Sequence, residues 1–233
     1  MNKLALFLGT LIVCSCSNSL DIKSIQNSPN SYESTYVTLR GIVSGVFQQT
    51  GELEGFFMQQ EGLFASSGIF VQSSIAVSLG DEISLNAKVI EYKNETRLDS
   101  VSSLQILSKN KSFKTQTLDL PFSLNAIEKL EGCLVSIPNT LQIADSYSYE
   151  KYGQLLVSAK NLVQATELYD AQNQAKEIEN HIQEQYLSSL LLDDLSNSKY
   201  PLEEALYAPK NSIVVGAKVK GIKGYLCQKN DTY

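Results

Sequence analysis

The chain has 233 residues, of which 43% are hydrophobic, so it is long enough for one large or two small domains with packed cores. Acidic residues (25) outnumber lysines and arginines (19), which gives a formal net charge of −6. Nucleic-acid binding depends mainly on neutralising phosphates with Lys and Arg, so this balance argues against a dominant nucleic-acid affinity and leaves only local basic patches open.

The first sixteen residues are typical of an export signal. Lys3 supplies a short positive region, and residues 4–13 form an apolar run that is too short to span a bilayer. The run ends at Ser15-Cys16, which resembles a bacterial lipobox with a small residue before the lipidated cysteine. We therefore expect lipidation at Cys16 and a membrane partner reached through that lipid. Because Ser17 is not aspartate, the expected location is the outer membrane of the cell envelope, with simple secretion as the alternative.

Residues 17–34 are interpreted as a tether, and residues 35–110 as a first barrel. Five segments of this barrel region are rich in β-formers, several with apolar and polar residues alternating at period two, as half-buried strands do. The predicted strands cover residues 37–44, 56–60, 69–72, 83–89 and 96–106. Gly41 and Gly45 would let the first strand coil sharply. Five short strands predict a small closed barrel of the OB type.

Alternation also assigns side chains to the two faces of these strands. If Phe56 and Ile69 point into the barrel, their neighbours Phe57 and Phe70 point outward. An outward aromatic pair on the second and third strands is where OB barrels stack bases. The hypothesised nucleic-acid site comprises Arg40, Phe57, Gln59, Phe70, Lys88 and Arg97. The alternative is that the two rings pack under loops or against the second half of the chain.

The second half is predicted to form another barrel. Residues 111–124 are interpreted as a polar linker and residues 125–233 as a second OB-like barrel, with short strands between 133 and 158. Apolar residues at spacings of three and four predict a helix at about 168–186. Residues 213–219 share an apolar pattern with 83–89, which supports two related barrels. The predicted fold class is all-β with one inserted helix, as two OB-like five-stranded barrels in tandem.

Few residues have the chemistry of a catalytic or metal site. Cys133 and Cys227 are the cysteines left after the signal; they either form a disulfide or are two core thiols. His181 is the single histidine, and we interpret it as a surface or boundary residue. Asp193 and Asp194 follow a leucine run and are interpreted as a turn rather than a cation site. No catalytic residues, metal ligands or cofactor are therefore predicted.

Seven short segments, in serial order and rough spacing, resemble one known family. They cover residues 37–43, 55–59, 67–71, 89–92, 130–135, 152–155 and 191–194. The family is the amino-terminal, non-catalytic portion of bacterial extracellular nucleases of the endonuclease/exonuclease/phosphatase superfamily. There, an OB-fold region precedes a metal-dependent nuclease domain, whose active site resembles a cluster of Asn, Glu and Asp with two histidines around Mg²⁺. This chain has one histidine, so that site cannot be assembled from it.

The resemblance implies an exported lipoprotein that acts as a non-catalytic OB-fold binding module. Its expected partners are the membrane, nucleic acid, and a separate nuclease chain or an envelope protein. The alternative is a structural or protein-docking envelope lipoprotein with no nucleic-acid role. A less favoured reading is a fragment or subunit of an active extracellular endonuclease.

Overall fold

The computed structural model describes residues 20–60, 62, 66–194, 196, 208 and 213–227. The expected signal peptide with Cys16, the start of the tether, and residues 228–233 lie outside the described residues. Throughout the described part, no helix combines the length and apolar character that a membrane crossing requires.

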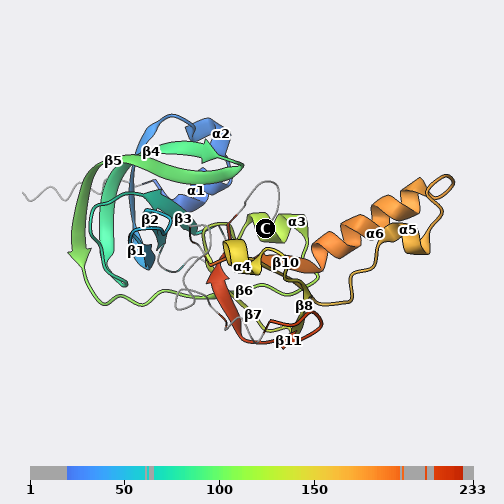
Figure 1. The fold of residues 1–233 in the computed structure, drawn as a ribbon. Coiled ribbons are helices and arrows are strands. Elements are labelled where there is room, and N and C mark those ends of the chain that lie inside the picture. The colour runs from blue at the N-terminus through green and yellow to red at the C-terminus, as the bar shows by residue number, and fades with distance from the viewer. Residues whose placement is uncertain are drawn as a thin grey trace, which may run out of the picture.

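Residues 36–108 form one closed barrel, drawn in blue to green in Figure 1. Its strands are β1 (Tyr36–Phe47), β2 (Gly55–Gln59), β3 (Gly68–Gln72), β4 (Glu82–Tyr92) and β5 (Glu95–Ser108). The strand order is β1-β2-β3-β5-β4, with β3 and β5 parallel and the other pairs antiparallel. Five strands closed in this way form an OB-like barrel. The predicted first barrel is confirmed.

Strand β1 closes the barrel because it pairs with two neighbours in turn. Its first half pairs with β4 as far as Ile42, and its second half pairs with β2 across a register shift between Val43 and Gly45. A Cβ at Gly41 would lie 2.6 Å from Met58 Cγ, so only glycine lets the strands cross this closely. Gly41 therefore allows a close approach of β2, and Gly45 leaves room for the Tyr225 ring; the sharp coiling expected from these glycines stays a prediction.

The described part of the expected tether is folded onto the barrel. It forms α1 (Ile22–Gln26) and α2 (Pro29–Tyr32), and the Asp21 side chain caps α1 by accepting from Ser24 N–H at 2.6 Å. Ile22 and Ile25 are fully buried and belong to the barrel's hydrophobic cluster. Two isoleucines three positions apart lie on one helix face, and the barrel core buries that face. A free tether at residues 20–34 is therefore wrong.

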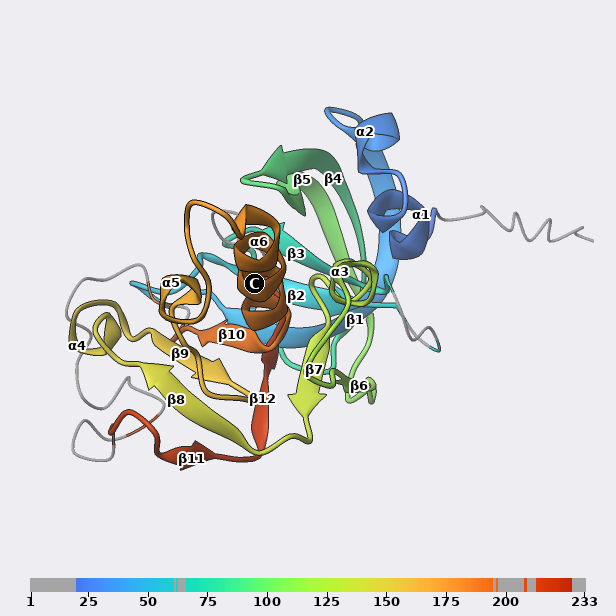
Figure 2. The same ribbon diagram turned by 90° about the vertical axis from the view of Figure 1, so that its right-hand side faces the viewer.

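Residues 116–227, which we call the two-sheet region, do not form a second closed barrel in their described part. The strands are β6 (Gln116–Thr117), β7 (Leu134–Ile137), β8 (Leu141–Asp145), β9 (Leu155–Ser158), β10 (Ser189–Leu192), β11 (Lys218–Val219) and β12 (Ile222–Tyr225). They make two open sheets, ordered β10-β9-β8-β11 and β12-β7-β6 (Figure 2). The tandem-barrel prediction is corrected to one barrel beside two small sheets.

Two segments differ from the roles that the predicted second barrel required. Of the predicted strand 213–219, only Lys218–Val219 pairs, while Gly216 adopts φ +87° in a turn and Val214 and Val215 are about 60% exposed. Beyond Lys218–Val219, contact with β8 is limited to the hydrogen bonds from Gly216 N–H to the Ile143 carbonyl at 2.8 Å and from Ile143 N–H to the Ala217 carbonyl at 2.9 Å, so the apolar pattern shared with β4 does not produce a strand of the same length. The expected linker 111–124 is not free either, because Leu118, Leu120 and Phe122 are buried in the region's core.

Helices occupy the connections of the two-sheet region. They are α3 (Leu124–Glu128), α4 (Tyr149–Tyr152), α5 (Ala165–Leu168) and α6 (Ala175–Leu187). The predicted helix at 168–186 begins only at Ala175, because the Asp170 carboxylate accepts from Gln172 N–H and Asn173 Nδ2 and stabilises a turn. Helix α6 projects from the body in Figure 1 and is seen end-on in Figure 2.

Candidate ligand-binding cavity

The two aromatic rings of the hypothesised nucleic-acid site lie side by side but are covered. Phe57 on β2 and Phe70 on β3 are register partners that lie outside the barrel cluster, as alternation predicts. Their exposed fractions are 0% and 2%. Tyr225 of β12 stacks on Phe57 with ring centroids 4.2 Å apart and planes 8° apart, and Phe47 packs edge-on at 5.7 Å. The structure agrees with the alternative interpretation, in which the rings pack against the second half of the chain.

Gln59 and Arg97 belong to the same covered face. The Gln59 side chain donates to the carbonyl of Lys114 at 3.1 Å and accepts from Leu134 N–H at 3.2 Å, so it joins the barrel to the two-sheet region. The Arg97 guanidinium pairs with Glu95 and lies 5.0 Å from the Phe70 ring centroid. Gln59 therefore links the two regions at the contact that we call the junction, whereas Arg97 contacts Glu95 and Phe70 within the barrel.

Arg40 and Lys88 are not part of that face. They lie on β1 and β4, on the other side of the barrel's strand order from β3. Arg40 forms an ion pair with Glu82 at 2.6 Å. Hydrogen bonds from Ser108 and Arg40 lower the pKa of Glu82, so that carboxylate is held in its charged form. The six predicted residues therefore form no single site.

Glycines allow the barrel and the two-sheet region to meet at backbone distance. Gly132 has φ +68°, donates to the carbonyl of Leu226 at 2.8 Å, and precedes Cys133, whose carbonyl accepts from Leu226 N–H at 3.1 Å. This is a bulge with glycine at its left-handed position. A Cβ on Gly132 would lie 2.7 Å from the carbonyl carbon of Gly68, so the first residue of β3 touches the chain leading into β7.

Buried carboxyl groups accompany this backbone contact. Glu131, 4% exposed, accepts from Thr96 N–H at 3.0 Å. Burial raises the pKa of Glu131 to about 8, against the opposing effect of that hydrogen bond. Burial also raises the pKa of Glu95, opposed by Arg97. Near neutral pH, Glu131 is therefore a mainly protonated acid in this junction.

The two cysteines are free thiols in the structure. Cys133 Sγ lies 3.8 Å from Ser67 Oγ across the junction. Cys227 follows Leu226 and interacts with the Glu95 carboxyl group. Burial raises the pKa of both thiols, which favours the protonated, unreactive form.

The other candidate groups are held in local structure. His181 Nε2 lies 3.1 Å from the carbonyl of Val163, and its ring packs against Tyr169. Asp193 accepts from Gln154 Nε2 at 2.6 Å, and Asp194 accepts from Ser196 N–H at 2.9 Å in a turn. Among the described residues, no group of three or more His, Cys, Asp or Glu side chains is placed to hold a metal ion.

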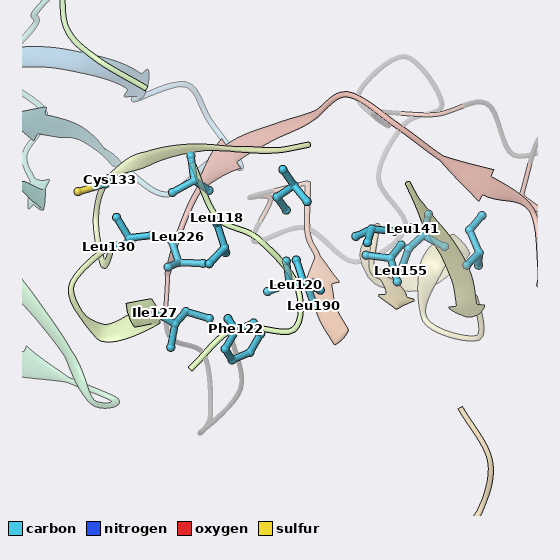
Figure 3. Close-up of a cluster of buried hydrophobic side chains, with 14 of the residues drawn as sticks. Leu118, Leu120, Phe122, Ile127, Leu130, Cys133, Leu141, Leu155, Leu190 and Leu226 are labelled. Atoms are coloured by element: carbon cyan, nitrogen blue, oxygen red, sulfur yellow. The ribbon is translucent and has the colours of Figure 1, made fainter. Parts of the chain in front are cut away.

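A cavity of about 1180 Å³ lies beside the junction. Its barrel side includes Phe57, Phe70 and Arg97, and its opposite wall is built by the two-sheet region. The apolar side chains of that wall that keep exposed surface come from both sheets and the turn before β11, and they include Leu192, Ile213, Ala217, Val219 and Ile222. These residues pack against the buried cluster drawn in Figure 3, in which Leu118 and Leu226 lie in one group and Leu141 and Leu155 in another, with Leu120 and Leu190 between them. The arrangement suits an apolar ligand.

Sequence reasoning missed the residues that define this cavity. Tyr225 stacks on the Phe57 ring, and nothing in the spacing of Tyr225 along the sequence assigns it to that ring. Lys218, Lys220 and Lys223 line the cavity, and their spacing around two apolar residues was a usable signal of a charged edge.

Comparisons with known proteins include a likeness to a solved structure. No family model matches the chain, and no curated protein matches it. A solved structure described as the hypothetical protein ygiW from E. coli is similar with a TM-score of 0.27 and 16% sequence identity. The match covers 36% of this chain and 86% of that chain. A likeness at this level carries no argument about function, and the OB-like character of the barrel rests on its own strand pairing.

Proposed function

We propose that the protein is a non-catalytic binding module, exported and lipid-anchored at Cys16 in the cell envelope, whose ligand occupies the cavity beside the junction. The observation that carries the proposal is the cavity itself. Its volume of about 1180 Å³ is slightly above the range of ordinary ligand pockets, roughly 300–1,000 Å³, so it is large enough for a small-molecule ligand. The wall is apolar, and a few polar groups stand among the apolar ones, as ligand sites require.

Base stacking on the barrel is not part of this proposal. Stacking needs an open ring face, and the Phe57 ring already has Tyr225 stacked on it. Oligonucleotide binding at low salt therefore serves as the competing outcome, since phosphate binding weakens steeply as salt rises. The partners predicted from sequence, namely a separate nuclease chain or an envelope protein, stay predictions. So does the protein-docking role.

A neutral apolar fluorophore, N-phenyl-1-naphthylamine, tests the proposal. We expect saturable binding to the folded protein, with fluorescence that is insensitive to salt. The variant Ala217→Trp places a large side chain at a half-buried position that lines the cavity, and it should abolish probe binding. The matched control is Ala175→Trp, at an exposed position of α6 outside the lining.

The outcome decides between the cavity and other sites. Loss of probe binding in Ala217→Trp alone, with unchanged far-ultraviolet circular dichroism, supports the proposal. Equal probe binding by both variants and the parent places the probe elsewhere and rejects it. Salt-sensitive binding of a single-stranded oligonucleotide without probe binding would replace it with a nucleic-acid role.

A further inference from the structure

The rim of the cavity carries a concentration of positive charge that the proposed function does not explain. Lys218, Lys220 and Lys223 stand within six residues on β11, β12 and the turn between them, and all three line the cavity. All three are exposed. The chain as a whole has a net charge of −6, so this rim departs from the general surface.

The same segment has an apolar side that fixes the direction of the lysines. Val219 and Ile222 are half-buried and pack against the two-sheet region's hydrophobic cluster. The lysines alternate with these residues, so their stems run along the cavity edge while their ammonium groups reach water. Lys218 Nζ donates to Gln142 Oε1 at 2.9 Å, which holds one ammonium group over β8.

The acidic groups of the lining do not cancel this rim. The lining has four carboxyl groups, those of Glu54, Glu95, Asp193 and Asp194, against five basic side chains. Glu95 is paired with Arg97 on the barrel side, and the three lysines of the rim stand together within six residues, so the positive charge is concentrated at that edge. An apolar cavity with ammonium groups at one edge is complementary to a molecule with an apolar body and an anionic end.

We propose that the ligand is an anionic amphiphile whose chain lies among the leucines of the cavity wall and whose head lies at Lys218, Lys220 and Lys223. This inference rests on the proposed binding function and names the ligand class. A carboxylate and a phosphate head share the chemistry the lysines would recognise. Leu191, Leu192 and Val219, which line the cavity and are half-buried, would contact the chain, and burial of their remaining apolar surface supplies the affinity.

The test is displacement of bound N-phenyl-1-naphthylamine by amphiphiles that differ only in their heads. Hexadecanoate, hexadecyl phosphate, hexadecanol and hexadecyltrimethylammonium are titrated below their critical micelle concentrations. We expect both anions to displace the probe at lower concentration than the alcohol, and the cation to be weakest. Comparison of hexadecanoate with hexadecyl phosphate identifies which anionic head is preferred.

Lysine variants test where the anionic head of the ligand binds. The triple variant Lys218→Gln, Lys220→Gln, Lys223→Gln should weaken hexadecanoate roughly tenfold, the combined effect of several exposed charge interactions, and leave hexadecanol unchanged. The matched control, Lys23→Gln, Lys109→Gln, Lys176→Gln, removes three exposed lysines outside the lining and should weaken neither. All substitutions are at exposed positions, and circular dichroism checks the fold.

Each outcome has a separate meaning. Equal displacement by hexadecanoate and hexadecanol, or an equal loss for both in the triple variant, overturns the amphiphile inference while the cavity keeps its role. Absence of probe binding in the parent protein overturns the proposed function itself.

Discussion

The barrel and the two-sheet region use similar apolar residues but reach different degrees of closure. Every barrel strand has two hydrogen-bonded neighbours, and the cluster inside is built from its own strands with α1. The two-sheet region has strands of two to five residues in two open sheets, and its side next to the barrel rests on Phe57 and Gly68. Closure makes a core self-sufficient, whereas open sheets need a neighbour to cover them. We therefore expect the two-sheet region to depend on the barrel more than the reverse.

The largest expected effect separates two adjacent phenylalanines of β2. Phe56 and Phe57 are both fully buried, but only Phe56 belongs to the barrel cluster, while Phe57 lies under Tyr225. Each Phe→Ala change should lower the free energy of unfolding by about 3–5 kcal/mol. Phe56→Ala should raise amide exchange in both regions, and Phe57→Ala mainly in residues 116–227. Hydrogen exchange measured by mass spectrometry reads each region separately, and identical exchange patterns in the two variants would contradict the comparison.

The second prediction tests the backbone contact between the regions. Gly132→Ala adds a left-handed strain and a clash with Gly68, and should destabilise by roughly 3 kcal/mol. The control is Gly221→Ala, which has φ +70° but no atom within 4 Å of the added Cβ, so only backbone strain of about 1 kcal/mol is expected. Urea unfolding of both variants measures the difference. If the two losses are equal, the contact with Gly68 contributes nothing.

The third and smallest expected effect is a dependence of the free energy of unfolding on pH. Its sign at the junction is opposite to its sign at Glu82. The pKa of Glu131 is raised to about 8 on folding, so the native state binds more protons than the unfolded chain between pH 4.5 and 8. Junction stability should therefore fall as pH rises through this range, by on the order of 2 kcal/mol after discounting for relaxation. The raised pKa of Glu95 acts in the same direction.

The ion-paired Glu82 of β4 should respond the other way. The pKa of Glu82 is lowered, so its contribution is present above pH 4.5 and is lost as pH falls. Glu131→Gln should flatten the pH dependence of exchange in residues 116–227, and the exposed Glu179→Gln on α6 should leave it unchanged. An unaltered slope in Glu131→Gln would assign the effect to other groups.

How far the sequence alone predicts the molecule differs between the two regions. Alternation over residues 37–106 places five strands correctly and assigns Phe56 and Phe57 to opposite faces, because period two is a local property of the chain. The candidate site was not predictable in the same way. Outward orientation on a strand does not determine exposure, and Phe57 is covered by Tyr225, 168 positions further along the chain.

Residues 213–219 show the limit most clearly. Their composition is that of a strand, yet Gly216 turns the backbone, and regular strand pairing with β8 is confined to Lys218 and Val219. A strand forms only where the backbone of another strand supplies hydrogen-bond partners, and the position of that second strand depends on segments distant in the sequence. The sequence by itself determined the barrel, whose inside and outside are set residue by residue. Only the tertiary structure decided which outward face is covered and where the cavity lies, because both arise from contacts between segments far apart in the chain.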